Sequence, residues 1–145
     1  MPLHIGKIFS FLRPTKTKKT RTHKILVIDD DRTTCNLIRS VLSKKGYEVQ
    51  VALDGQNGLN EVERFKPDVI FLDCLMPDMG GVEVGKRLKE NEKTNSIPII
   101  FLTCVDTPQN IIECYDLGAE NYLVKPVSPK EMISQIEASL EEIAE

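Results

Sequence analysis

Residues 67–73, Pro67-Asp68-Val69-Ile70-Phe71-Leu72-Asp73, enclose four consecutive apolar residues between two aspartates. A short run of this composition is typical of a strand that is buried on both faces. Such strands occur in parallel sheets that carry helices on both sides, and ligands collect where the strands end. Asp73 therefore stands where a functional carboxylate is expected.

Further apolar runs alternate along the chain with longer stretches of helical periodicity. Strands are expected at residues 24–28, 48–51, 69–72, 97–102 and 122–124. Helices are expected at residues 32–45, 56–65, 82–91, 107–118 and from Pro129 to about residue 143. This alternation predicts an α/β fold, a doubly wound parallel sheet of five strands with five helices.

Glycine, proline and hydroxyl-bearing residues mark several of the expected helix ends. Gly46 is a good terminator for the first helix, while Thr107-Pro108 and Ser128-Pro129 are start signals for the last two. Glu131 lies three residues after Ser128 and can reach back to complete a capping box. The first helix is expected to turn an apolar face to the sheet, formed by Leu37, Ile38, Val41 and Leu42.

The length and composition of the chain indicate one compact domain. A chain of 145 residues with 41% hydrophobic composition can close a core without disulfides or a structural metal. Residues 1–24 hold seven basic side chains and no acidic one, so residues 25–145 carry 12 basic and 22 acidic side chains, a formal charge of −10. A domain this acidic is not expected to bind nucleic acid directly. The domain is assigned to residues 24–145.

Residues 1–23 form a basic extension. Ile5, Ile8, Phe9 and Leu12 are spaced as on one face of a short amphipathic helix. Two interpretations stay open: a flexible tail, or a helix that docks weakly on an anionic membrane or a partner protein.

The four cysteines form no C-x-x-C pair and lie within apolar or helical patterns: Cys35, Cys74, Cys104 and Cys114. They are expected to be reduced, mostly buried thiols of a cytoplasmic protein.

Acidic residues gather at the expected strand ends. Asp29, Asp30 and Asp31 follow the first strand directly, and Asp73 follows the third. Asp31 is interpreted mainly as a helix cap. Two like charges about 4 Å apart repel by roughly 4 kcal/mol at an effective dielectric of 20, so a cation is expected among the other three. All-oxygen ligation suits Mg²⁺, for which Mn²⁺ can substitute.

A hydroxyl and an ammonium end two more strands. The fourth apolar run ends at Thr103 and the fifth at Lys125. Beside a metal-held phosphoryl donor, Asp73 is expected to attack as the nucleophile. Lys125 offers a second cation to the phosphoryl oxygens, and Thr103 can donate a hydrogen bond to them.

Five motifs occur in order: Ile25-Leu26-Val27-Ile28-Asp29-Asp30-Asp31, then residues 67–73, then Met76-Pro77 with Gly81, then Pro98-Ile99-Ile100-Phe101-Leu102-Thr103, and Tyr122-Leu123-Val124-Lys125-Pro126. With them the chain resembles, over about residues 24–143, the receiver domains of two-component response regulators, including the single-domain chemotaxis regulators. The resemblance implies a flavodoxin-like sheet of order 2-1-3-4-5.

The resemblance also implies roles for individual residues. Asp73 is the implied phosphorylation site, with Thr103 and Lys125 as its catalytic partners. The implied metal ligands are Asp29, Asp30, Asp73 and the backbone carbonyl of Leu75, with Asp30 more direct than Asp29. Tyr122 is implied to act as a switch with Thr103, and Lys125-Pro126 to be a cis bond.

A sensor histidine kinase or a histidine phosphotransferase is the implied phosphoryl donor, and a downstream protein is implied to bind the face formed by residues 103–140. Because the sequence ends after the last helix, we expect a stand-alone receiver, a phosphoacceptor rather than an enzyme, that signals through protein contacts. The alternative is a pseudo-receiver that binds partners without phosphorylation.

Two enzyme classes fit less well. A haloacid-dehalogenase-type phosphatase needs a second aspartate two residues after its nucleophile, where this chain has Leu75. A nucleotide-binding enzyme with a phosphate-cradling loop would show G-x-x-x-x-G-K-[ST], which does not occur.

Leu75 and Val105 are apolar at positions that often hold polar groups in receiver domains, and Cys104 stands where a smaller residue is usual. We expect these side chains to hinder hydrolytic water and to slow loss of the phosphoryl group. A Leu75→Asn, Val105→Glu double variant should therefore lose the group faster, as followed by intact mass after the donor is removed. An unchanged phosphoryl lifetime would contradict this expectation.

Overall fold

The computed structural model describes residues 21–103 and 121–144. Within them, five parallel strands form one sheet in the order β2-β1-β3-β4-β5. The strands are β1 (Lys24–Ile28), β2 (Glu48–Ala52), β3 (Val69–Asp73), β4 (Ile99–Thr103) and β5 (Asn121–Val124). The predicted fold class and strand order are confirmed.

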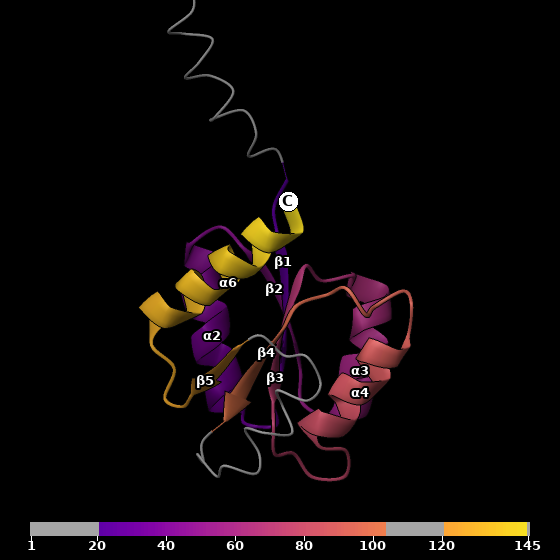
Figure 1. Ribbon diagram of the computed structural model, residues 1–145. Helices are drawn as coiled ribbons and strands as arrows, with labels where there is room; N and C mark the ends of the chain where they lie inside the picture. The colour runs from indigo at the N-terminus through magenta and orange to yellow at the C-terminus, as the bar shows by residue number, and fades with distance from the viewer. Residues whose placement is uncertain (1–20, 104–120, 145) are drawn as a thin grey trace, which may run out of the picture.

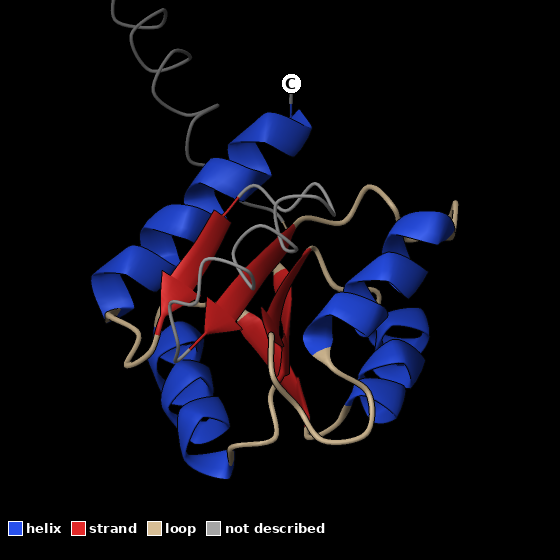
Figure 2. Ribbon diagram, turned by 60° about the horizontal axis from the view of Figure 1, so that its bottom comes forward, coloured by secondary structure: helices blue, strands red, loops and turns tan. Residues whose placement is uncertain are grey.

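The described helices are α2 (Arg32–Lys44), α3 (Gly55–Phe65), α4 (Gly81–Glu90) and α6 (Pro129–Ala144). Figure 1 shows α2 and α6 over one face of the sheet and α3 and α4 over the other. Figure 2 views the sheet toward its strand ends, with the two helix pairs on either side. The helix expected at 107–118 and the extension up to residue 20 lie outside the described residues.

Helix ends follow the predicted signals. Asp31 accepts a hydrogen bond from the backbone N–H of Thr33 and caps α2. Gly46, just past the end of α2, has φ of 95°, a conformation that glycine adopts without strain. Ser128 Oγ accepts from the backbone N–H of Glu131 at 3.3 Å at the start of α6.

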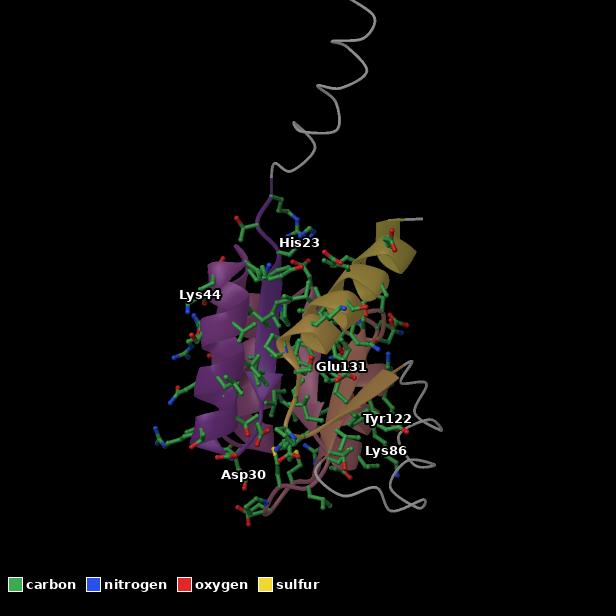
Figure 3. All side chains as sticks on the ribbon, turned by 90° about the vertical axis from the view of Figure 1, so that its left-hand side faces the viewer. His23, Asp30, Lys44, Lys86, Tyr122 and Glu131 are labelled. Atoms are coloured by element: carbon green, nitrogen blue, oxygen red, sulfur yellow. The ribbon has the colours of Figure 1, made fainter. Side chains whose placement is uncertain are left out.

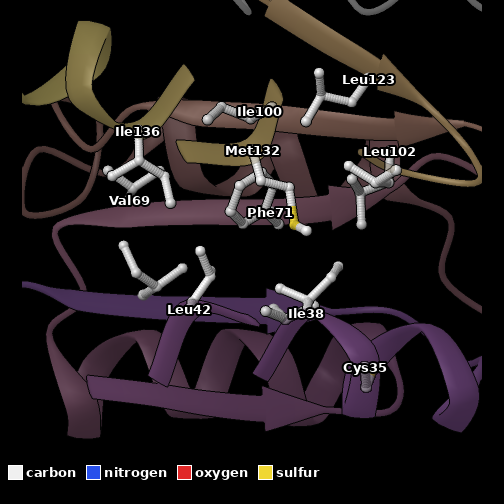
Figure 4. Packing of buried hydrophobic residues seen from close by; sticks show 13 residues of the cluster. Cys35, Ile38, Leu42, Val69, Phe71, Ile100, Leu102, Leu123, Met132 and Ile136 are labelled. Carbon is white, nitrogen blue, oxygen red and sulfur yellow. The ribbon is translucent and has the colours of Figure 1, made fainter. Parts of the chain in front are cut away.

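Side chains alternate between the two faces along each strand, so each helix pair covers its own core cluster. On the α3 and α4 side the buried members include Leu26, Ile28, Ile70, Leu72, Val84, Leu88 and Phe101. Figure 4 shows the opposite cluster, in which Ile38 and Leu42 of α2 and Met132 and Ile136 of α6 pack around Phe71. Every residue of β3 and β4 is buried, as the apolar runs predicted.

Two expectations need correction. Leu37 was expected to face the sheet, but 46% of it is exposed, because the buried stripe of α2 runs through Cys35, Ile38 and Leu42. The strand expected at 97–102 begins later and ends at Thr103. The N–H of Ile97 instead donates to the carbonyl of Thr94, which closes a turn before the strand.

Cys35 and Cys74 are buried and free, as predicted. Cys104 and Cys114 lie outside the described residues. Lys125-Pro126 is a cis peptide bond, also as predicted. In the portion of the chain that the structure describes, no helix is long and apolar enough to cross a bilayer.

Two leucines of α2 give a matched test of the packing. Leu42→Ala removes a fully buried side chain and should lower the free energy of unfolding by about 2–5 kcal/mol. Leu37→Ala, on the exposed face, should cost less than about 1 kcal/mol. Urea denaturation followed by circular dichroism measures both, and equal losses would show that Leu37 packs against the core.

Candidate functional site

The parallel sheet brings the carboxyl ends of its strands to one edge. Neighbouring strands continue their hydrogen bonding past their last residues: Cys74 N–H donates to the carbonyl of Leu102 at 2.9 Å, and Lys125 N–H to that of Thr103 at 2.8 Å. The loops that leave β1, β3, β4 and β5 therefore start side by side. Figure 3 shows Asp30 at this edge, at the opposite end of the domain from His23.

Three carboxylates meet at this edge. Asp29, Asp30 and Asp73 each offer one oxygen, and these oxygens all lie within 4.8 Å of one another. Asp29 and Asp73 are buried, whereas Asp30 is exposed. The cluster is therefore held from inside the domain and opens to solvent on the side of Asp30.

Lys125 places a positive charge beside two of these carboxylates. Its Nζ lies 2.7 Å from Oδ2 of Asp29 and 3.6 Å from Oδ1 of Asp73, and its side chain is 15% exposed. Three ionised carboxylates and one ammonium leave a formal charge of −2 in a confined space. A divalent cation would neutralise this charge.

The donor set fits Mg²⁺. Oδ1 of Asp29 accepts from the N–H of Asp31 at 2.9 Å. Oδ2 of Asp29 is buried and accepts no hydrogen bond; its 2.7 Å contact with Lys125 is an ion pair without hydrogen-bond geometry. Mg²⁺ is commonly bound through one or two carboxylates while water fills its other positions, and the exposed side of the cluster gives water access.

Burial raises the pKa of Asp73 to about 7, and the neighbouring charge of Asp29 adds to this rise. Lys125 acts in the opposite direction, since an ammonium favours the ionised carboxylate. Side-chain hydrogen bonding with Asp29 and Asp30 raises the pKa further, because it favours the protonated form of Asp73. Near neutral pH and without a metal, Asp73 is thus poised between its two protonation states.

Asp31 belongs to the helix rather than to this cluster. Its carboxylate accepts hydrogen bonds from Thr33 N–H at 3.1 Å and Thr34 Oγ1 at 2.6 Å. The bond from Thr34 is the largest cause of its lowered pKa. The interpretation of Asp31 as a helix cap is confirmed, while its backbone N–H orients Asp29.

Thr103 and Tyr122 share one face of the sheet. Thr103 is buried at the end of β4, and Tyr122 of β5 pairs with Phe101, two residues before it. Residues paired across parallel strands, and residues two apart on one strand, point to the same face. Tyr122 is partly buried and packs against the core cluster on the α3 and α4 side.

Leu75 follows Asp73 by two residues, and its side chain is 52% exposed. Val105 and Cys104, the other residues expected to hinder water, lie outside the described residues.

Two supports of the site were missed by reasoning from sequence. Cys35 Sγ lies 3.2 Å from the carbonyl of Asp29 and donates to it, and nothing in the spacing of these residues signals the contact. The sequence showed Gly81 as part of a motif but not its role. A Cβ on Gly81 would stand 2.1 Å from the carbonyl oxygen of Asp73, so only glycine lets α4 begin there.

The sequence model of the response regulator receiver domain family matches residues 25–137. The chain belongs to this family. Its sheet order, acidic edge and cis Lys125-Pro126 bond are those that the resemblance implied. Receiver domains bind Mg²⁺ at an acidic pocket, and Asp29, Asp30 and Asp73 form such a cluster here.

Curated relatives include the DNA-binding dual master transcriptional regulator RpaA of Synechocystis and the alkaline phosphatase synthesis transcriptional regulatory protein PhoP of Bacillus subtilis. Each is 38% identical over 117 residues, which cover 81% of this chain and 48% of the relative. The chain thus spans about half the length of the curated relatives it matches.

Solved structures with the same fold are matched by this chain over nearly the whole of their own length. The chemotaxis protein CheY4 of Vibrio cholerae aligns with a TM-score of 0.78 at 30% identity, over 82% of this chain and 99% of that one. A CheY-like receiver domain protein of Methanospirillum hungatei aligns with a TM-score of 0.79 at 27% identity, over 84% and 96%.

Two adjacent glycines test how α4 supports the site. Gly81→Ala forces a methyl group against the Asp73 carbonyl and should lower the free energy of unfolding by about 1–3 kcal/mol, with a weaker Mg²⁺ affinity. Gly80→Ala meets its nearest atom at 3.5 Å and should cost less than about 1 kcal/mol. Urea denaturation and calorimetric Mg²⁺ titration distinguish them, and equal behaviour would contradict the assigned role of Gly81.

Mg²⁺ binding should depend on pH through Asp73. Its pKa of about 7 lies above the ordinary value of 3.8, so below pH 7 a proton occupies the carboxylate and competes with the metal. We expect the dissociation constant for Mg²⁺ to rise as pH falls below 7, by up to about tenfold per pH unit. Calorimetry across this range measures it, and a slope that persists in Asp73→Asn would assign the proton to another group.

The raised pKa of Asp73 also makes the stability of the metal-free fold depend on pH. Between about pH 4 and 7 the metal-free folded chain holds a proton at Asp73 that the unfolded chain has released. The contribution of Asp73 to the free energy of unfolding therefore falls as pH rises through this window.

Proposed function

We propose that this receiver domain accepts a phosphoryl group on Asp73 from a histidine kinase or a histidine phosphotransferase, in a Mg²⁺-dependent reaction. The observation that carries the proposal is the cluster of Asp29, Asp30 and Asp73 with the Lys125 ammonium inside it. Membership in the receiver family supports the same reading.

In the proposed reaction, an ionised oxygen of Asp73 attacks the phosphorus of a phosphohistidine. The new O–P bond forms as the P–N bond breaks, and the leaving imidazole keeps the electron pair and takes up a proton from solvent. Burial leaves the ionised Asp73 carboxylate poorly solvated, which makes it a better nucleophile. Lys125 lowers the pKa of Asp73 and so reduces the fraction of Asp73 that is protonated and unable to attack. Asp29, Asp30, Asp73 and the backbone carbonyl of Leu75 would hold Mg²⁺, which would supply positive charge to neutralise the transferring group.

Lys125 and Thr103 complete the proposed site. Lys125 already lies between Asp29 and Asp73, and a small movement would bring its ammonium to a phosphoryl oxygen. The Thr103 hydroxyl would donate to another oxygen, and its displacement would free space for Tyr122, which shares its face of the sheet. We assign the switch to this pair, and the surface it changes to residues 103–140, where a downstream protein would bind.

We further propose that the domain acts as a phosphoacceptor without turnover of a free substrate, and that residues 25–145 contact proteins rather than nucleic acid. Their formal charge of −10 would be repelled by a phosphate backbone. RpaA is named as a DNA-binding regulator, and the matched region covers 48% of its length. The complete set of acids, Thr103 and Lys125 favours phosphorylation over a pseudo-receiver role.

Phosphorylation is tested with acetyl phosphate and Mg²⁺, with intact mass as the readout. We expect one added phosphoryl group that is absent in Asp73→Asn and absent when EDTA removes the metal. Asp31→Asn is the matched control, because it makes the same change at the same edge outside the metal cluster and should still be labelled. Labelling of Asp73→Asn at the parent level would refute the assignment, and steady phosphate release from many esters would indicate a phosphatase.

A further inference from the structure

A concave surface lies at the end of the domain opposite to the acidic cluster. It has a volume of about 740 Å³ and lies between the C-terminal end of α3 and the segment that links α4 to β4. Its lining residues are Val62, Glu63, Lys66 and Pro67 from the first region, and Asn91, Lys93, Thr94 and Ile97 from the second. This volume falls within the roughly 300–1,000 Å³ that is usual for ligand pockets.

The lining is apolar at its base and charged at its rim. Val62 and Pro67 are buried, and Ile97 packs partly buried against the core cluster on this side of the sheet. Glu63, Lys66 and Lys93 are exposed around them. Such a surface suits a segment that presents apolar side chains on one face and charged ones on the other.

The chain enters the domain beside this concavity. Arg21 forms an ion pair with Asp68, which directly follows the lining residue Pro67. The N–H of Lys24 donates to Oδ2 of Asp68 at 2.7 Å, and the N–H of Asp68 donates to the carbonyl of Lys24 at 2.7 Å. These contacts hold the start of the described chain next to Pro67.

The sequence before Arg21 contains apolar residues at the spacing that such a surface requires. Ile5, Ile8, Phe9 and Leu12 recur at helical spacing. Residues 13–20 link them to Arg21 and reach at most about 30 Å when extended. A tether of this length keeps the apolar residues near the concavity at an effective concentration on the order of millimolar.

We propose that residues 5–12 dock through their apolar side chains into the concavity formed by Val62, Pro67, Ile97 and their neighbours on the same chain. Docking at this end leaves the acidic edge open. The N-terminal extension thus binds the domain of its own chain and covers a surface separate from the phosphorylation site.

Amide NMR of the full chain tests the docking. An Ile8→Asp, Phe9→Asp double variant removes apolar contact, and Thr15→Asp with Thr17→Asp makes a similar addition of negative charge in the linker. We expect the first pair to shift the amide signals of Lys66 and of residues 91–97, and the second pair to leave them close to the parent spectrum. A synthetic peptide of residues 1–14 added to the first variant should restore the parent positions.

Other outcomes would overturn the proposal. Signals of residues 66 and 91–97 that do not respond to the first double variant would show that the concavity is empty of this segment. Shifts that vanish on dilution would indicate docking onto a second copy. Unchanged lining signals, together with pelleting on vesicles of phosphatidylcholine and phosphatidylserine that the first variant abolishes, would assign residues 5–12 to a membrane surface instead.

Discussion

The candidate site of this receiver domain depends on the placement of buried charge at the carboxyl edge of its sheet. Asp29 and Asp73 are buried side chains of like charge, and they are tolerated because Lys125 lies 2.7 Å from one and 3.6 Å from the other. A buried carboxylate without such a partner would be costly. Even with Lys125, the pKa of Asp73 is raised to about 7, which leaves the site short of positive charge. That shortage makes it receptive to a divalent cation.

The surrounding structure keeps these groups in place. The strands β3 and β4 are buried throughout, so their ends cannot shift without disturbing both core clusters. Gly81 lets α4 begin against the backbone of Asp73, where any larger residue would collide. On the other side of the sheet, two groups hold Asp29 by hydrogen bonds. The N–H of Asp31, the cap of α2, donates to the Asp29 carboxylate, and the thiol of Cys35 in α2 donates to the Asp29 carbonyl. The proposed phosphoryl transfer needs this rigidity, because misplacement of a reacting group lowers the rate of transfer.

The two ends of the sheet carry different kinds of surface. At the carboxyl end, charged side chains converge and the environment raises the pKa of Asp73. At the amino end, the Arg21 and Asp68 ion pair anchors the entering chain beside a concavity with an apolar base. Because the strands separate these ends, a ligand at one leaves the other accessible. The proposed phosphoryl transfer and the proposed docking are thereby assigned to opposite edges of one small domain.

The sequence alone determined the order of strands and helices along the chain, the caps of α2 and α6 and the polar residues at the ends of β1, β3, β4 and β5, because hydrophobic period and turn chemistry are local properties. The order of the strands within the sheet was implied by the family resemblance instead. Asp29, Asp30, Asp73, Thr103 and Lys125 could therefore be predicted as one group. Only the tertiary structure decided which side chains are covered: it exposes Leu37 although its neighbour Ile38 is buried, and it pairs Cys35 with the carbonyl of Asp29. It also revealed the concavity between α3 and the segment before β4. These features depend on how distant segments approach one another, and no short stretch of sequence contains that information.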